Sequence, residues 1–303
     1  MHPRRGKFSH AAHFGIRTGV HGRQLPESAL VCNVPDPATG AGLLEYDDVR
    51  TIFHEFGHLL HSLFAGHGQW AGVGGISTER DFVEAPSQML EEWPHDARVL
   101  RTFARHHKTG EVIPHELVER LRCAEGFGRG LQTSNQMMYA KMSLAYYNSN
   151  ASSVDIWGTF RTLWRRANLA PFPEGSHFPC AFGHLNGYSA TYYTYLWSKV
   201  IAKEMFGAFN QTDLLDPTPA LRYRRAILEP GGSQPAAQLL RGFLGRDYTS
   251  SAWETWFYED SCLVAEQSEP QLLWRTHNVT LVLLVVVVVF AVGCLLRRWQ
   301  LQR

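Results

Sequence analysis

Cysteine is scarce in this chain, and neither sign of charge dominates. The 303 residues include only five cysteines, and these show no paired spacing. A disulfide framework or a cysteine-based metal site is therefore not indicated. Lys and Arg number 29 against 28 Asp and Glu, which leaves a net charge of +1. Because nucleic-acid partners usually require a strongly basic surface, we expect no nucleic-acid partner.

Phosphate-binding motifs and internal repeats are also lacking. The glycine-rich stretch 66–75 is not followed by Gly-Lys-Ser/Thr and shows no strand-to-helix fingerprint, so a nucleotide cofactor is not expected. This stretch is interpreted either as a mobile substrate loop or as a plain connector. Apolar side chains, in contrast, are plentiful. Hydrophobic residues make up 45% of the chain and aromatic residues 12%, which is enough for a sizeable folded core.

The most informative stretch is His-Glu-Phe-Gly-His at residues 54–58. Two histidines four residues apart on a helix project from the same face, so His54 and His58 can reach one metal ion. Glu55 is rotated away from both and can instead reach a metal-bound water. Zinc held this way, with a free coordination position, makes a hydroxide-like nucleophile at neutral pH. The motif therefore predicts metal-assisted peptide hydrolysis.

The segment around this motif has the periodicity of a helix. Apolar residues recur at helical spacing through residues 47–64, and Asp47 and Asp48 suit the helix start as caps or dipole partners. His61 follows His58 by one turn, and we expect it to have a structural role. Metal-bound histidines usually donate their second ring nitrogen to an acceptor, for which Asp48 is one candidate and Asp81 another.

A third metal ligand has to come from elsewhere in the chain, since catalytic zinc usually takes three protein ligands. Residues 81–93 predict a second helix, with Asp81 as N-cap and Pro86 near the first turn. Glu84 could present its carboxylate from this helix. Physical reasoning alone does not separate it from the neighbouring acidic residues Glu79, Glu91 and Glu92.

Two motifs in the same order resemble one known family. The stretch 54–58, followed by Glu-Arg-Asp-Phe-Val-Glu-Ala-Pro-Ser-Gln at 79–88, is similar to the thimet oligopeptidase/neurolysin family of zinc peptidases. The resemblance implies a zincin-like catalytic domain with one zinc per chain. By the same resemblance, His54, His58 and Glu84 are the zinc ligands and Glu55 is the general base.

The resemblance extends over roughly residues 1–260. Residues 182–188 and 192–198 resemble the family's substrate-binding loop. This resemblance implies that His184, Tyr188 and Tyr195 contact the substrate and the developing oxyanion. Tyr192 and Tyr193 are expected in a packed aromatic cluster beside Trp197. Further similar segments are 1–7, 229–233 and 242–247.

One part of the family pattern is not found. Family members have a large helical N-terminal part, which together with the catalytic half flanks a channel that restricts substrates to short peptides. Here only about fifty residues precede the metal motif.

Taken together, the motifs and the resemblance predict a zinc metalloendopeptidase of the oligopeptidase type that acts on short peptides. The alternative is a truncated, inactive or partner-dependent remnant that binds peptide without cleaving it.

The remaining patterns predict a mainly α-helical catalytic domain with a small β-sheet. Helical periodicity marks residues 116–123, 133–147 and 154–167, whereas 13–16 and 28–34 are the better strand candidates. We expect this domain to extend over residues 1–262, with a linker at 263–278.

An uncharged apolar run at 279–296 predicts one C-terminal transmembrane helix, because its 18 residues would extend about 27 Å. The chain is therefore expected to be a single-pass membrane protein that contacts the lipid bilayer through this run. Arginines in the basic tail, 297–303, favour a cytoplasmic C-terminus and an external domain. No apolar signal segment precedes the domain, however, and a tail anchor would place it in the cytosol.

Overall fold

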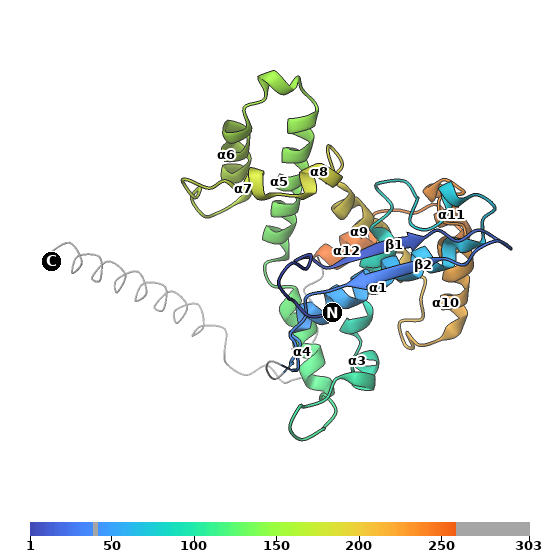
Figure 1. Ribbon diagram of the computed structural model, residues 1–303. Helices are drawn as coiled ribbons and strands as arrows, with labels where there is room; N and C mark the ends of the chain where they lie inside the picture. The colour runs from blue at the N-terminus through green and yellow to red at the C-terminus, as the bar shows by residue number, and fades with distance from the viewer. Residues whose placement is uncertain (39–41, 259–303) are drawn as a thin grey trace. The chain divides into compact units, whose positions relative to one another are not determined.

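The computed structural model describes residues 1–38 and 42–258. This part of the chain is mainly helical with one two-stranded sheet (Figure 1). Its first half contains β1 (Ala12–Arg17), β2 (Glu27–Val31), α1 (Tyr46–Phe64), η1 (Ala65–His67), η2 (Ala71–Val73), α2 (Ala85–Leu90), η3 (Trp93–His95), α3 (Ala97–Phe103) and α4 (His115–Glu125). Its second half contains α5 (Arg129–Tyr147), η4 (Ala151–Ser153), α6 (Ile156–Ala167), α7 (Phe178–Ala181), α8 (His184–Gly187), α9 (Thr194–Phe206), α10 (Pro217–Tyr223), the π-helix η5 (Arg224–Leu228), α11 (Ala236–Leu244) and α12 (Ser251–Tyr258).

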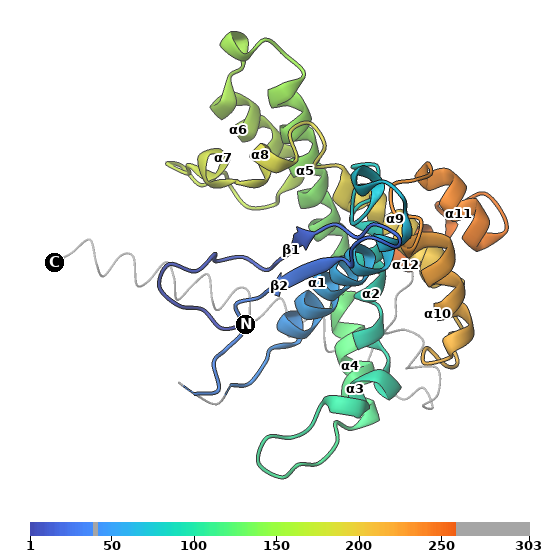
Figure 2. The same ribbon diagram turned by 45° about the vertical axis from the view of Figure 1, so that its right-hand side comes forward.

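The two strands form an antiparallel sheet that packs against α1. Ala12 pairs with Val31 and Phe14 with Ala29, and a bulge lies between Gly15 and Arg17. The sheet lies beside α1 in both views (Figures 1 and 2), where the hydroxyls of Ser28 in β2 and Ser62 in α1 are 2.8 Å apart. Both expected strands are confirmed, although β2 ends at Val31 rather than at residue 34.

Helix α1 forms where the apolar periodicity predicts it. It begins after Glu45, and a capping box joins Glu45 to Asp48. The two partners satisfy backbone N–H groups that the first turn of a helix leaves unpaired. On its inner side, α1 packs closely on α2. A Cβ atom at Gly57 would lie 2.6 Å from Ser87 Cα, so the glycine of the metal motif is what lets the two helices approach.

The second predicted helix starts later than expected. Residues 80–84 form turns, and α2 begins at Ala85 with Glu84 as its N-cap. The prediction that Asp81 caps this helix is therefore wrong. Pro86 provides the reason: a helix capped at Asp81 would place this proline in its interior, where its missing N–H removes a helical hydrogen bond. In the observed helix, Pro86 lies in the first turn, where that N–H is not needed.

Helix α9 forms part of the main hydrophobic core. Its residues Ile201, Ala202 and Met205 are buried with side chains of α2, η5 and α11. A second cluster joins α5 and α6 through Met138, Met142 and Phe160. The helices expected at 116–123, 133–147 and 154–167 are confirmed as α4, α5 and α6.

The expected fold class needs one correction. Within residues 1–38 and 42–258, no helix is both long enough and apolar enough to cross a membrane. The longest, α1 and α5, have 19 residues each but carry charged and polar side chains throughout. The predicted transmembrane helix and the single-pass membrane location are thus not supported. The run 279–296, the linker at 263–278 and the tail at 297–303 lie outside the described residues.

Candidate metal centre

Three side chains from two helices meet at one point. His54 and His58 lie one turn apart on α1, and Glu84 lies at the N-cap of α2. Glu84 Oε2 is 3.3 Å from His54 Nε2 and 3.2 Å from His58 Nε2. One donor atom from each residue lies within 4.8 Å of the other two. Two imidazole nitrogens and one carboxylate oxygen are a donor set that divalent transition metals accept, so the residues fit a metal ion.

The electrostatics of this cluster match its geometry. The Glu84 side chain is only 3% exposed, and burial alone would raise its pKa. Hydrogen bonds with His54 and His58 outweigh burial and hold the pKa of Glu84 well below its usual value. Burial likewise works to lower the pKa of His54, but hydrogen bonds with Glu84 and Glu91 raise it to about 10. The ionised carboxylate of Glu84, the form that can ligate a cation, is therefore favoured at this point.

The partner of the first histidine is a glutamate that sequence reasoning did not assign to this role. His54 Nδ1 lies 2.8 Å from Glu91 Oε1. The expectation that Asp48 or Asp81 orients a ligand imidazole is not met for His54, because Asp48 caps α1 and Asp81 accepts a hydrogen bond from Tyr193. One signal was available in the sequence: Glu91 follows Glu84 by seven residues, or about two helical turns, which returns it to the same face.

Glu55 lies on the same helix in a largely closed environment. It is 8% exposed, and burial raises the pKa of its carboxyl group. A hydrogen bond from the backbone of His13 in β1 connects it to the sheet. His61, one turn beyond His58, is fully buried, and burial lowers its pKa to about 3. A neutral, enclosed imidazole fits the structural role expected for His61.

The three residues expected on the substrate side also lie together. His184 begins α8, Tyr188 follows that helix, and Tyr195 lies in the first turn of α9. The Tyr188 hydroxyl donates a 2.6 Å hydrogen bond to Glu84 Oε1, which connects this group to the histidine–glutamate cluster. The ring centroid of Tyr195 lies 5.1 Å from that of Tyr188 and 5.8 Å from that of His184.

The neighbouring tyrosines divide between core and surface. Tyr192 is 7% exposed and its ring contacts those of Tyr139 and Phe182, so it lies in a packed aromatic cluster as predicted. The predicted neighbour, Trp197, instead packs its ring against Tyr248. The same prediction is wrong for Tyr193, which is 45% exposed and donates its hydroxyl hydrogen to Asp81. The physical reason is the turn that precedes α9, which points consecutive side chains in different directions.

Arg80 joins the two halves of the site, and sequence reasoning gave it no role. Its guanidinium lies 4.2 Å from the ring centroid of Tyr188, and it donates a hydrogen bond to the backbone oxygen of Gly187. Arg80 is the first residue of the turns that lead to Glu84. It therefore connects the third donor residue to the tyrosine-bearing loop at a distance of more than a hundred residues in sequence.

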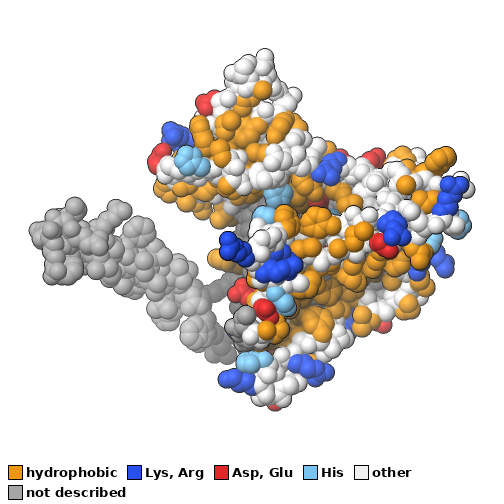
Figure 3. Space-filling model, in the orientation of Figure 1, with side chains coloured by type: hydrophobic (Ala, Val, Ile, Leu, Met, Phe, Trp, Pro, Cys, Tyr) orange, Lys and Arg blue, Asp and Glu red, His pale blue; other side chains and the backbone are white. Residues whose placement is uncertain are grey.

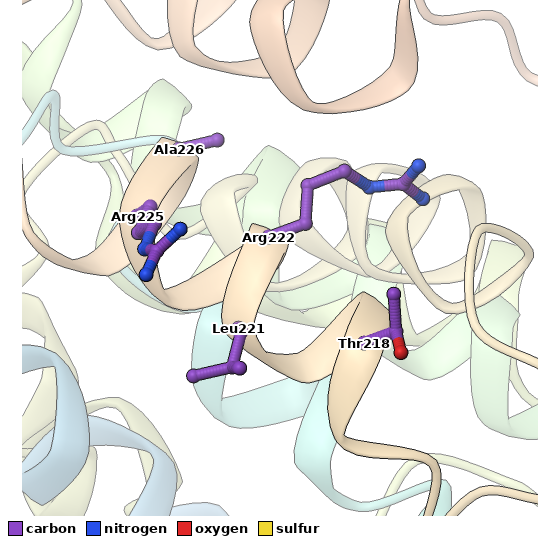
Figure 4. Close-up of a pocket in the computed structure, with 5 residues that line it drawn as sticks. All are labelled: Thr218, Leu221, Arg222, Arg225 and Ala226. Atoms are coloured by element: carbon purple, nitrogen blue, oxygen red, sulfur yellow. The ribbon is translucent and has the colours of Figure 1, made fainter.

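A separate hollow lies on α10 and the π-helix that follows it (Figure 4). Its lining residues are Thr218, Leu221, Arg222, Arg225 and Ala226. Arg222 is already engaged, since it donates to the backbone oxygen of Ala208 and lies over the Phe243 ring. None of the candidate metal or substrate residues lines this hollow, so it adds nothing to their chemistry.

Curated proteins with similar sequences are peptidases by name. The chain is 33% identical over 262 residues to a thimet-like oligopeptidase of Dictyostelium discoideum, a match covering 84% of this chain and 39% of that protein. It is 33% identical to saccharolysin of Saccharomyces cerevisiae, covering 84% of this chain and 37% of that protein. It is 36% identical to the dipeptidyl carboxypeptidase of Escherichia coli, covering 71% and 32%.

The chain thus spans about two fifths or less of the length of these relatives. The family model described as peptidase family M3 matches residues 1–258, which includes every residue of the candidate site. This match confirms the resemblance drawn from the two sequence motifs. The chain belongs to peptidase family M3.

Proposed function

We propose that this chain is a zinc-dependent endopeptidase that hydrolyses bonds in short peptides. In this proposal, His54, His58 and Glu84 hold one zinc ion per chain. The observation that carries it is the position of Glu84 Oε2, 3.3 and 3.2 Å from the Nε2 atoms of the two histidines. Membership of a peptidase family and the names of the oligopeptidase relatives support the same reaction.

The chemistry is divided between the metal and the side chains around it. Bound zinc would polarise the scissile carbonyl and acidify the attacking water. Glu55 would accept the proton of that water and later deliver it to the leaving amine. The hydroxyls of Tyr188 and Tyr195 and the ring N–H of His184 would donate hydrogen bonds to the oxyanion, as such groups do in other acyl-transfer sites.

The rival hypothesis of an inactive, peptide-binding remnant is not favoured. Such a remnant would be free to lose the polar side chains of its site. Here the donor atoms of the three residues lie within 4.8 Å of one another, and Glu55 is adjacent to His54 on α1. The Tyr188 hydroxyl also reaches this cluster from a distant part of the chain.

The test uses the full chain, a short internally quenched peptide and metal analysis. We expect about one zinc per chain. Glu55→Gln keeps the size of the side chain but removes the proton acceptor, so turnover should fall about 10²–10⁴-fold while zinc stays bound. Glu116→Gln, at an exposed position in α4, is the matched control and should retain turnover. Near-normal turnover by Glu55→Gln would remove Glu55 from the mechanism, and a wild-type chain without peptide turnover would contradict the proposal itself.

A further inference from the structure

The carboxylate of Glu91 is shared between a candidate zinc ligand and an ammonium group. Its Oε1 atom lies 2.8 Å from His54 Nδ1, and its Oε2 atom lies 3.4 Å from Lys199 Nζ. Each oxygen thus has its own partner, which fixes the plane of the carboxylate. Neither side chain is freely solvated, since Glu91 is 17% and Lys199 18% exposed.

We infer that Lys199 is a positioning residue for the metal centre: it holds the Glu91 carboxylate, which in turn holds the His54 imidazole with Nε2 directed at Glu84. The inference rests on the proposed zinc site and deepens it. Partners of metal-bound imidazoles set the ring orientation and the tautomer, and their loss commonly weakens metal binding. Lys199 acts one step further out, on the partner itself.

The position of Lys199 is itself well defined. Lys199 follows Tyr195 by four residues on α9, so both project from the same face of that helix. Two hydrogen bonds of 2.9 Å tie α9 to the segment that carries Glu84 and Glu91: Gln88 Nε2 donates to the backbone oxygen of Tyr195, and Ser198 Oγ donates to that of Asp81. These hydrogen bonds hold the backbone of α9 in place beside α2, so the position of Lys199 relative to Glu91 is defined.

The positive charge of Lys199 lies close to two negatively charged carboxylates. Glu91 and Glu92 are adjacent carboxylates near the end of α2, and both lie in the low-dielectric zone between α2 and α9. Lys203 Nζ lies 2.7 Å from the Glu92 carboxylate. Lys199 Nζ lies 3.3 Å from Glu92 Oε1 and reaches both carboxylates. Without this bridging cation, Glu91 would be repelled by Glu92 and could turn away from His54.

The test measures the zinc dissociation constant of the full chain by competition with a chelator. We expect Lys199→Met to raise this constant about tenfold, the lower end of the range for lost outer partners of metal ligands. Lys199→Arg keeps the charge and should restore most of the affinity. Glu91→Gln should weaken zinc binding to a similar degree. Adding Lys199→Met to Glu91→Gln should then change little, because the route from Lys199 to His54 is already broken.

Arg246→Met is the matched control for general damage to α9. Glu204 lies on α9, and its Oε2 atom is 2.7 Å from Arg246 Nη2. Arg246→Met therefore removes a contact of α9 that does not involve the metal centre. This variant should lower thermal stability and leave zinc affinity unchanged. The inference is overturned if Lys199→Met binds zinc as tightly as the wild type does. It is also overturned if Lys199→Met causes the same loss of zinc affinity in the wild-type chain and in the Glu91→Gln variant. If Lys199→Met does not fold, Lys199→Gln replaces it in the cycle. A wild-type chain that binds no zinc contradicts the proposed function instead.

Discussion

The two sides of the candidate site are held in different ways. On the donor side, His54, His58 and Glu84 are joined by contacts of 3.2–3.3 Å between charged or polar atoms, with Glu91 and Lys199 behind them. On the substrate side, His184, Tyr188 and Tyr195 contact one another through rings whose centroids are 5.1–6.1 Å apart. The first arrangement consists of short polar contacts, whereas the second combines ring packing with one hydrogen bond from the Tyr188 hydroxyl to Glu84. Ring packing tolerates rotation more readily than short polar contacts do.

The backbone follows the same division. The donor residues project from α1 and from the start of α2, two helices that meet closely at Gly57. On the substrate side, Tyr195 projects from the first turn of α9, whereas His184 and Tyr188 project from the four-residue helix α8 and the residue after it. The last two lie next to the α5–α7 region, where hydrophobic side chains cover much of the visible surface in Figure 3.

The largest effect is expected when proposed ligands are removed from the donor side. His54→Ala combined with His58→Ala removes two of the three proposed ligands, so the chain should lose its zinc and its peptide turnover entirely. Metal analysis after gel filtration measures the first effect and a peptide assay the second. Full zinc retention by this variant would show that the metal, if any, is bound elsewhere. His115→Ala, at an exposed position in α4, should leave both properties intact.

The substrate side should respond in turnover but not in metal content. Tyr188→Phe and Tyr195→Phe each remove one proposed oxyanion donor, so kcat should fall about 10²–10³-fold while zinc affinity changes little. Tyr193→Phe removes an exposed hydroxyl that binds Asp81 and serves as control, with turnover close to wild type. If Tyr188→Phe instead released zinc, its hydrogen bond to Glu84 would belong to the donor side and the division would fail.

The smallest expected effect concerns the charge network behind the donors. Burial would raise the pKa of Glu92, but Lys203, Lys199 and His95 lower it to about 2. A carboxyl group whose pKa is depressed on folding contributes stability above its unfolded pKa, near 4.5, and this contribution disappears as the pH falls towards 2. The difference in unfolding free energy between wild type and Glu92→Gln should therefore be at most about 3 kcal/mol at pH 7 and should shrink at pH 3.

Urea denaturation of both proteins at the two pH values measures this difference. Glu119→Gln, which alters an exposed ion pair with Arg122 in α4, is the control and should show little change at either pH. A Glu92→Gln effect that is equal at pH 7 and pH 3 would mean that the carboxylate is not stabilised by its lysine partners.

Local patterns located α1, which carries both histidines of the site, but they misplaced the start of α2. Apolar periodicity located α1, α4, α5 and α6, and strand patterns located β1 and β2, because these signals depend on near neighbours in the chain. Where two local signals competed, the outcome was less secure. Asp81 is a good capping residue, but Pro86 moved the start of α2 to Ala85. The apolar run that predicted a membrane helix lies outside the described residues, and the described helices do not support a membrane location.

The sequence by itself determined which residue types could bind a metal: two histidines one turn apart, a glutamate between them and an acidic residue downstream. The family resemblance favoured Glu84 as that acidic residue. Only the tertiary structure decided which acidic side chain meets which imidazole. Glu84 lies between both histidines, Glu91 lies behind His54, and Glu92 pairs with lysines of α9. Lys199 and Tyr188 join these groups across more than a hundred residues. Such contacts depend on how α1, α2 and α9 pack together, and the spacing of residues along one helix does not contain that information.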